Sequence, residues 1–293
     1  MDPTTSTSDL LAPGTRVDDF IIDRVIGGGG FAVVYRATST REPRDFVIKE
    51  YFPAKLAKRD ENGNVTPLDE STRSLFLEGR KLFFQEASML ASLEHPNIAA
   101  IVGFFHANGT VYTAMRYDHG ISLYGYIKRK SGHLPESRIL SIILPVLDCL
   151  RLVHARGVLH LDIKPGNIYL RQDAGPILID FGAVRKLLRS APSHVFPIVS
   201  HGFSPIEQSK KNARLGPWTD LYAVGATMRA CIEAAAPPSA RERMEADTLV
   251  PATKAFAGEY SPSFLAAIDF ALHVMPGERP QSVDEFTDAL ASP

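Results

Sequence analysis

Residues 158–182, VLHLDIKPGNIYLRQDAGPILIDFG, decide the fold of this chain. They contain two short apolar runs, residues 168–170 and 177–179, separated by the turn-like residues 172–176. Apolar runs of this length on either side of a polar, Gly- and Pro-containing turn predict a β-hairpin. Polar residues that can carry chemistry lie at both ends of this hairpin.

Asp162 and Asn167 precede the first run, and Asp180 follows the second. Because antiparallel pairing returns the end of one strand to the start of the other, we expect Asn167 and Asp180 to lie close together. An amide carbonyl and a carboxylate suit Mg²⁺, which keeps waters and phosphates as its other ligands. Asp162 would add a carboxylate to orient a hydroxyl, and Lys164 a positive charge. The alternative is a surface hairpin with ordinary turn residues.

The combined pattern HxDxKxxN followed by DFG resembles the catalytic core of eukaryotic-type (Hanks-type) serine/threonine protein kinases. The resemblance implies an α+β, bilobal protein kinase fold, with a β-rich N-lobe carrying one main helix and an α-helical C-lobe. It also implies ATP and Mg²⁺ as cofactors, with Mn²⁺ as an alternative metal. In that family Asn167 and Asp180 would be the metal ligands, and Asp162, Lys164 and Asn167 would be catalytic.

Composition is consistent with a globular protein and gives no global electrostatic signal. The chain has 293 residues and is 45% hydrophobic, and its 32 Lys and Arg nearly balance its 33 Asp and Glu. We therefore expect no nucleic-acid partner. Cys149 and Cys231 lie in apolar helical patterns and are interpreted as reduced core thiols. No apolar run is long enough for a membrane span and no signal segment is evident, so the expected location is cytoplasmic.

A glycine-rich turn near the start of the chain predicts phosphate binding. Residues 1–15 are predicted to be a disordered tail, and residues 20–26 and 33–37 to be strands. Glycines at such a turn let backbone N–H groups approach phosphate oxygens. In the family pattern GxGxxGxV, the third glycine is Ala32 here, for which we expect a slightly stiffer loop. The implied ATP contacts are Gly27, Gly28, Gly29, Gly30, Phe31, Ala32 and Val34.

Lys49 and Glu86 are expected to form an ion pair. Lys49 ends the apolar run 46–48 and matches the lysine that, in the family, holds the α- and β-phosphates. Glu86 falls on the apolar stripe of a predicted helix containing Phe83, Leu90 and Leu93, where an unpaired carboxylate would be costly. Residues 51–78 are interpreted as an insertion before this helix, with packing as the default role.

The predicted lobes meet at a hinge. Residues 16–115 would form the N-lobe, residues 116–120 the hinge and residues 121–293 the C-lobe. By resemblance, Met115 would limit the depth of the adenine pocket and Tyr117 would offer backbone groups to adenine. Val47, Lys49, Leu170 and Asp180 complete the implied ATP site. Beyond the hinge, the pattern predicts helices over 123–130, from Pro135–Glu136 to Val153 with a kink at Pro145, and over 283–291 with a Ser282/Glu285 capping box.

Leu161 replaces the arginine that, in most kinases, binds a phosphorylated activation-loop residue. Because leucine cannot bind phosphate, we expect activity that does not depend on a loop phosphate captured at this position. Ser190, Ser193 and Ser200 are candidate phosphorylation sites. Structural roles are implied for Phe181, Gly182, Glu207, Asp220 and Arg279: Glu207 would pair with Arg279, and Asp220 would tie down the catalytic-loop backbone.

The resemblance covers roughly residues 18–290 and implies transfer of the γ-phosphoryl group of Mg-ATP to Ser or Thr hydroxyls of protein substrates. Autophosphorylation through a transient homodimer is expected. One alternative is a pseudokinase scaffold that binds nucleotide without efficient transfer. It is suggested by Ala32, by Leu161 and by Pro205–Ile206, which stand where the family has the first two residues of an Ala-Pro-Glu motif. Another is a small-molecule kinase of the aminoglycoside type, which shares the HxDxxxxN loop but needs neither the glycine-rich loop nor the Glu207 and Arg279 pair.

Overall fold

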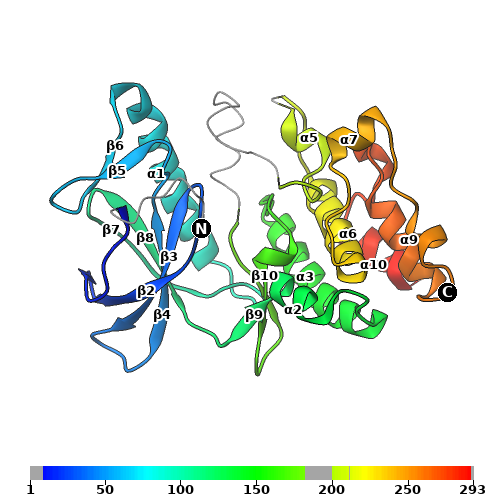
Figure 1. Ribbon diagram of the computed structural model, residues 1–293, viewed down its shortest axis with the longest axis horizontal. Coiled ribbons are helices and arrows are strands. Elements are labelled where there is room, and N and C mark those ends of the chain that lie inside the picture. Colours follow the sequence, from blue (N-terminus) through cyan, green and yellow to red (C-terminus); the bar gives the residue numbers. More distant parts are fainter. Residues whose placement is uncertain (1–8, 182–199, 211, 292–293) are drawn as a thin grey trace. The chain divides into compact units, whose positions relative to one another are not determined.

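The computed structural model describes residues 9–181, 200–210 and 212–291, and the chain divides into two units (Figure 1). Of the described residues, the first unit comprises 9–94 and 99–118, and the second comprises 95–98 and those from 119 onward. The division between Asp118 and His119 falls within the segment 116–120 that the sequence marks as a hinge.

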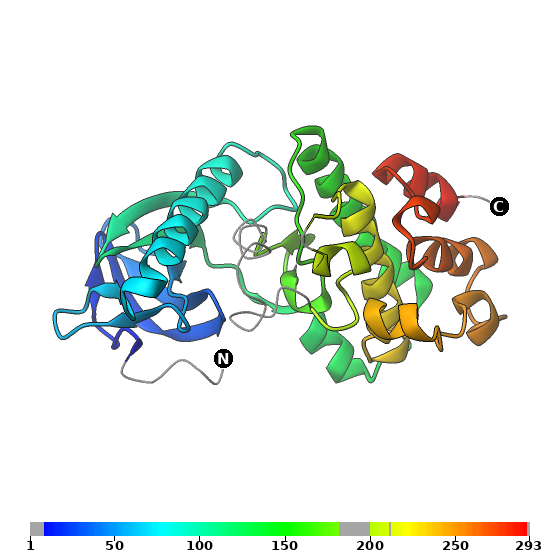
Figure 2. The same cartoon turned by 90° about the horizontal axis from the view of Figure 1, so that it is seen from above.

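The first unit is an antiparallel sheet with one long helix beside it (Figures 1 and 2). Its sheet has the strand order β1-β2-β3-β4-β8-β7, and α1 packs on β7 and β8. A separate hairpin pairs β5 with β6. The elements are β1 (Arg16–Val17), β2 (Phe20–Gly29), β3 (Ala32–Ser39), β4 (Asp45–Tyr51), β5 (Ala57–Arg59), β6 (Val65–Pro67), α1 (Glu70–Ala91), β7 (Ile101–Ala107) and β8 (Thr110–Arg116).

Helix α1 begins well before the position expected from the sequence. Asp69 caps its N-terminus, its side chain accepting the N–H of Thr72 while the Thr72 hydroxyl accepts the N–H of Asp69. This reciprocal cap starts the helix at Glu70, so residues 70–78 belong to α1 and the expected insertion 51–78 ends at Asp69. Leu93, assigned to the helical stripe, lies beyond the last helical residue. The Ser- and Thr-containing residues 71–74, which were expected to lie in the insertion, therefore belong to the first turns of α1.

The second unit is mainly helical and carries the predicted hairpin. β10 pairs with β11, Ile168 facing Leu178, and also with β9 on its other side. Its elements are β9 (Gly120–Ser122), α2 (Leu123–Lys130), α3 (Glu136–Ala155), η2 (Pro165–Asn167), β10 (Ile168–Arg171), β11 (Pro176–Leu178), α5 (Ile206–Ser209), α6 (Pro217–Glu233), α7 (Ala240–Glu245), α8 (Ala252–Ala255), α9 (Pro262–Ala271), η3 (Pro276–Glu278) and α10 (Val283–Ala291).

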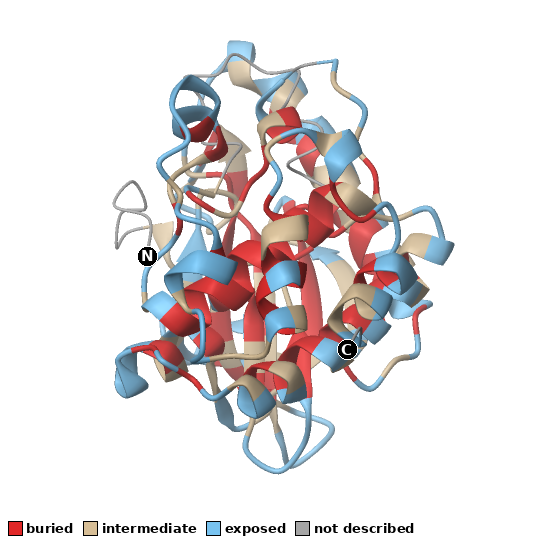
Figure 3. Cartoon of the chain, turned by 90° about the vertical axis from the view of Figure 1, so that its right-hand side faces the viewer, coloured by how far each residue is buried: buried red, intermediate tan, exposed pale blue. Residues whose placement is uncertain are grey.

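Helix α6 forms the centre of this unit, with every residue from Thr219 to Ile232 buried. Figure 3 shows the buried residues gathered on the inner helices and the exposed ones at the periphery. Cys149 and Cys231 are both buried and free, and burial raises the pKa of each thiol to about 12. The prediction that both thiols lie in the core is thus confirmed. Among the described residues, no helix has the length and apolarity that a membrane span requires.

The cap of the last helix differs in one detail from the sequence prediction. Ser282 accepts the N–H of Glu285, as a capping box requires. The Glu285 carboxylate, however, accepts the N–H of Gln281 instead of that of Ser282. The helix still starts at Val283, because the Glu285 carboxylate satisfies the N–H of Gln281, the residue before Ser282.

Candidate active site

One face of the first unit's sheet collects the side chains expected to contact nucleotide. In β4 the buried positions Phe46, Ile48 and Glu50 alternate with the partly exposed Val47 and Lys49. Side chains two residues apart share a face of a strand, and so do directly opposed residues on paired strands.

Cross-strand register extends this face. Val34 is opposite Lys49, with Gly27 opposite Val34, and Met115 is opposite Val47. These residues, predicted from separate motifs, thus lie in two adjacent rows on one face of the sheet. Lys49 sits inside β4 and not at its end, because the strand continues to Tyr51.

The glycine-rich turn is the tip of the β2–β3 hairpin. The ladder runs as far as Gly29 opposite Ala32, which leaves Gly30 and Phe31 as the turn. A Cβ added at Gly29 would meet no other atom within 4 Å. Packing in the described part of the chain therefore does not require glycine at position 29. Close approach of a ligand to the backbone would explain why a glycine is present.

Lys49 approaches helix α1 on the stripe that carries Glu86. Its amine lies 5.5 Å from the ring centroid of Phe83, a cation–π contact one turn before Glu86. Glu86 is 8% exposed. Burial of a carboxylate at this depth requires a compensating partner. The Phe83 contact places the Lys49 amine on the stripe of α1 that carries Glu86, so the Lys49–Glu86 ion pair stays a prediction.

In the second unit, the catalytic-loop residues surround Asp162, whose exposure is only 7%. The Lys164 amine donates to its carboxylate at 3.0 Å. The Asn167 amide donates to both the backbone oxygen and Oδ2 of Asp162, at 2.9 and 2.8 Å. Because both contacts use the amide nitrogen, Asn167 Oδ1 is the atom with which this side chain would bind a cation.

The hairpin brings Asn167 next to the segment that carries Asp180. The N–H of Ile179 donates to the backbone oxygen of Asn167 at 3.0 Å. Asp180 itself has a φ of 59°, an uncommon value for a residue other than glycine. The oxygen donors of Asn167 and Asp180 therefore satisfy, in residue type and sequence placement, the requirements of a Mg²⁺ site that also uses waters and phosphates.

His160 connects the catalytic loop to the Asp180 segment. Its Nδ1 accepts the N–H of Asp162, and its Nε2 lies 3.1 Å from the carbonyl oxygen of Ile179. The ring is fully buried and packs on Phe181, and burial lowers its pKa. The neutral tautomer with hydrogen on Nε2 satisfies both contacts. Gly182, the last residue of this motif, lies outside the described residues.

Asp220, near the start of α6, holds the backbone of the catalytic loop. Its carboxylate accepts the N–H groups of His160 and Leu161 at 2.9 and 2.8 Å and contacts the His154 ring at 2.8 Å. Leu161 has a φ of 63°, a strained value for this residue. The Gln208 side-chain amide donates to the Leu161 carbonyl. Asp220 and Gln208 therefore fix both backbone groups of the strained residue.

Glu207 and Arg279, paired by the sequence argument, form a buried ion pair with two contacts of 2.7 and 3.1 Å. Arg279 also donates to the carbonyl oxygens of His273 and Val274, both at 2.7 Å. The Thr219 hydroxyl donates to Glu207. Every polar atom of this pair is thereby engaged, which is the condition under which a buried ion pair persists.

Ser200 occupies a place that the sequence argument did not foresee. Its hydroxyl donates to Asp162 Oδ1 at 2.8 Å and accepts from the Lys164 amine at 3.2 Å. The sequence indicates it only as a candidate phosphorylation site, together with Ser190 and Ser193, which lie outside the described residues. A phosphate on Ser200 would place negative charge beside Asp162, so we expect modification there to inhibit activity.

Comparison with known proteins agrees with this geometry. The family model described as "Protein kinase domain" matches residues 20–290, and the chain belongs to this family. The match assigns it to protein kinases and not to small-molecule kinases of the aminoglycoside type.

Among its relatives is serine/threonine-protein kinase PknA of Nostoc sp., 27% identical over 91% of this chain and 46% of that protein. Another is serine/threonine-protein kinase D of Synechocystis sp., 32% identical over 72% of this chain and 40% of the relative. The chain thus spans less than half the length of these curated relatives.

The fold has solved counterparts. A structure described as "PpkA-294 apo form" has a TM-score of 0.87 and 34% identity, covering 97% of this chain and 100% of that one. The Mycobacterium tuberculosis PknI kinase domain has a TM-score of 0.70 at 24% identity, a likeness that concerns the fold alone. The predicted bilobal kinase fold, with a β-rich N-lobe and a helical C-lobe, is confirmed.

Proposed function

We propose that this chain is an active serine/threonine protein kinase that transfers the γ-phosphoryl group of ATP to hydroxyls of proteins. The observation that carries the proposal is the contact between a serine hydroxyl and the catalytic carboxylate, Ser200 Oγ donating to Asp162 Oδ1 at 2.8 Å. It supports the role of Asp162 because a group that orients or deprotonates a hydroxyl must accept its hydrogen bond at this range.

The remaining roles follow from position and chemistry. Asp162 would accept the proton of the substrate hydroxyl, and Lys164, already bonded to it, would stabilise charge on the transferred phosphoryl group. Asn167 and Asp180 would hold magnesium, which supplies charge neutralisation of the phosphates when bound. Lys49, supported by Glu86, would bind the α- and β-phosphates. Gly27, Val34, Val47 and Met115 of the first unit would contact ATP, and so would Leu170 on β10 of the second unit, which is 7% exposed.

Labelled ATP and the purified chain test the proposal. We expect label on Ser or Thr of a mixed-sequence peptide library and of the chain itself, with Mg²⁺ and more weakly with Mn²⁺. Asp162→Asn should lower the rate by about 10²–10⁴-fold, the range for loss of a general base. Asp173→Asn, an equal loss of charge in the exposed β10–β11 turn, is the matched control and should retain the rate.

A wild-type chain that binds ATP but labels no hydroxyl faster than Asp162→Asn would contradict the proposal. That result would favour the pseudokinase alternative. Mass spectrometry of the incubated chain identifies the modified residue type in the same experiment.

Activity is also proposed to be independent of a loop phosphate captured at Leu161. This side chain is 5% exposed and apolar, so it offers no donor to a phosphate. The double variant Ser190→Ala/Ser193→Ala should therefore keep its activity. Ser200 must be tested separately because its hydroxyl contacts Asp162. A double variant without activity would overturn this part of the proposal.

Two further assignments belong with this proposal. The buried free thiols Cys149 and Cys231 support a reducing compartment, for which the cytoplasm is the proposed location. A transient homodimer is proposed for autophosphorylation between copies. A labelling rate per mole of protein that rises with protein concentration would support it, whereas a rate independent of concentration would indicate reaction within one copy.

A further inference from the structure

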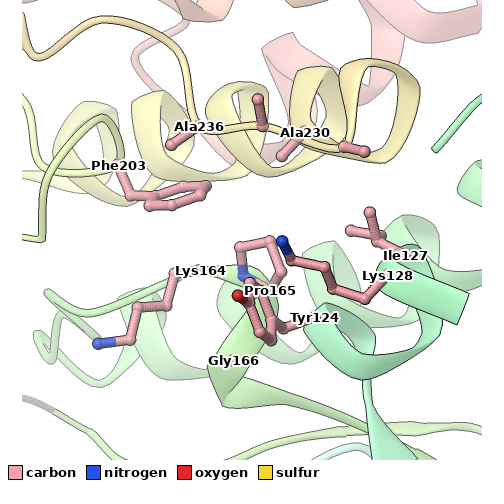
Figure 4. A pocket seen from close by; sticks show the side chains of 11 residues that line it. Tyr124, Ile127, Lys128, Lys164, Pro165, Gly166, Phe203, Ala230 and Ala236 are labelled. Atoms are coloured by element: carbon pink, nitrogen blue, oxygen red, sulfur yellow. The ribbon is translucent and has the colours of Figure 1, made fainter. Parts of the chain in front are cut away.

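A cavity of about 280 Å³ lies in the second unit beside the catalytic loop (Figure 4). Its walls come from α2, from the loop around Pro165, from Phe203 and from the C-terminal end of α6. The residues that line it are Tyr124, Ile127, Lys128, Lys164, Pro165, Gly166, Phe203, Ala230, Ala234, Ala235 and Ala236. The active-site roles assigned above use none of these except Lys164.

The walls are apolar and the only charges among the lining residues are positive. Four small alanine side chains leave the space open, and two aromatic rings, Tyr124 and Phe203, face it. Lys128 supplies a cation, its amine 5.6 Å from the centroid of the Tyr124 ring. The nearby Glu233 carboxylate is engaged by Arg229 at 2.7 Å. Among the described residues that line the cavity, none is an aspartate or glutamate to which a basic side chain could bind.

Lys164 joins the cavity to the proposed reacting centre. Its side chain lines the space, while its amine contacts Asp162 and Ser200 at 3.0 and 3.2 Å. Figure 4 shows this amine turned away from the space that Phe203, Pro165 and Tyr124 border. Phe203 follows Ser200 by three residues, in a segment where the N–H of Ser200 donates to the Ser204 hydroxyl. The cavity and the Asp162 carboxylate are therefore separated by about the length of the Lys164 side chain.

We propose that this cavity is a specificity pocket that binds an apolar side chain of the polypeptide substrate and rejects lysine and arginine. At about 3.3 Å per extended residue, the bound side chain would lie within roughly three residues of the phosphorylated hydroxyl. The volume fits one large aliphatic or aromatic side chain, since an apolar cavity of about 150 Å³ holds benzene. An acidic residue next to the apolar one would be tolerated because Lys128 lies at the pocket. This inference rests on the proposed kinase activity and names its substrate class.

The first test is a peptide library in which each position within four residues of a central serine is varied in turn, phosphorylated by the chain with Mg-ATP. At one position we expect leucine or phenylalanine to raise kcat/KM about 10–100-fold over glycine, the range for filling a hydrophobic pocket. Lysine at that position should give a kcat/KM lower than that of the glycine peptide. Transfer to the library with no apolar preference at any position would overturn the inference while leaving the kinase proposal intact.

Variants assign the preference to the cavity. Ala236→Phe, at an exposed lining position, should fill the space, and Tyr124→Ala, 56% exposed, should remove a wall. Each should reduce the leucine preference at least about tenfold, whereas Leu144→Ala, an exposed apolar residue of α3 outside the pocket, should not. Lys128→Glu should allow lysine at the selected position, and Lys130→Glu, the same charge change two residues away, should not. Selectivity unchanged in Ala236→Phe and Tyr124→Ala would overturn the assignment.

A binding experiment keeps the inference testable without phosphoryl transfer. With ¹³C-methyl-labelled alanine, the methyl groups of Ala230, Ala234, Ala235 and Ala236 report occupancy of the pocket by NMR. We expect these signals to shift with a serine peptide that has leucine at the selected position, but not with the same peptide carrying lysine there. If no transfer occurs and no position is selected, the two peptides carry leucine or lysine at every flanking position. Equal shifts, or shifts with free indole but with neither peptide, would refute a substrate pocket. Selective shifts without any transfer would support the pocket and overturn the kinase proposal.

Discussion

Removing Arg279 should destabilise the second unit more than any surface charge change. The substitution Arg279→Met keeps much of the side-chain volume but leaves the Glu207 carboxylate, 3% exposed, without its cation. It also leaves the carbonyl oxygens of His273 and Val274 without a donor. Breaking a buried ion pair by removing one partner costs about 3–5 kcal/mol.

The magnitude can be measured as a melting shift. For a unit of this size, 1 kcal/mol corresponds to about 2–4 °C, so calorimetry should show a decrease of roughly 6–20 °C in the transition of the second unit. Arg241→Met is the matched control in the same unit, because its contact with Glu245 at 3.5 Å is exposed. It should leave the transition in place, since exposed ion pairs contribute little.

The double variant Glu207→Gln/Arg279→Met tests the physical reason. Because it removes both charges, it should be more stable than Arg279→Met alone, despite carrying two substitutions. A double variant as unstable as the sum of its single variants would show that the ion pair is not the source of the loss. A decrease below about 2 °C for Arg279→Met would refute the argument altogether.

Three further changes have defined outcomes. Burial lowers the pKa of His160 below its ordinary 6.5, so the unfolded chain binds a proton that the folded chain does not, and stability should fall as pH drops below about 6.5. Urea titrations from pH 7.5 to 5 should give a smaller slope for His160→Gln, and an unchanged slope would contradict the burial argument. Asp220→Asn leaves one oxygen to accept the two buried N–H groups of His160 and Leu161. It should lower the free energy of unfolding, measured by urea titration, by about 1–3 kcal/mol and should also reduce kcat. An unchanged free energy of unfolding would refute the proposed role of Asp220 in holding the catalytic-loop backbone. Arg59→Met leaves Glu50, fully buried, without its cation and should lower the first unit's melting temperature, whereas Lys58→Met on the exposed neighbour should not.

The sequence predicted those parts of the site that depend on local pattern. Local pattern predicted the hairpin around residues 168–178. Val34, Lys49, Val47 and Met115 were expected from the family resemblance, and strand alternation explains why they share one face of the sheet. Helix α2 begins and ends at the predicted residues, since Ser122 caps it and Ser131 ends it in a left-handed conformation. In these places a few neighbouring residues determine the conformation.

Contacts between residues far apart in the chain were not predictable in the same way. Glu50 follows Lys49 and looks like an ordinary charged strand residue, but its carboxylate is fully buried and accepts from Tyr35, Tyr112 and Arg59. Arg59 lies on β5, in the segment interpreted as an insertion. No periodicity connects these positions, because the partners of Glu50 come from two other strands, β3 and β8, and from the separate β5–β6 hairpin.

The buried carboxylate also gives the inserted segment a physical role. Arg59 donates to Glu50 at 2.7 Å, packs on Phe52 and donates to the backbone of Asp9 and Gly63. Glu50 is the residue after Lys49, and alternation along β4 places its side chain on the opposite face. The β5–β6 hairpin thereby anchors the strand from which Lys49 projects. Because a one-residue slip of β4 would move the Glu50 carboxylate to the other face, away from Arg59 and its two tyrosine partners, the inserted segment favours the register that places Lys49 on the face expected to contact nucleotide.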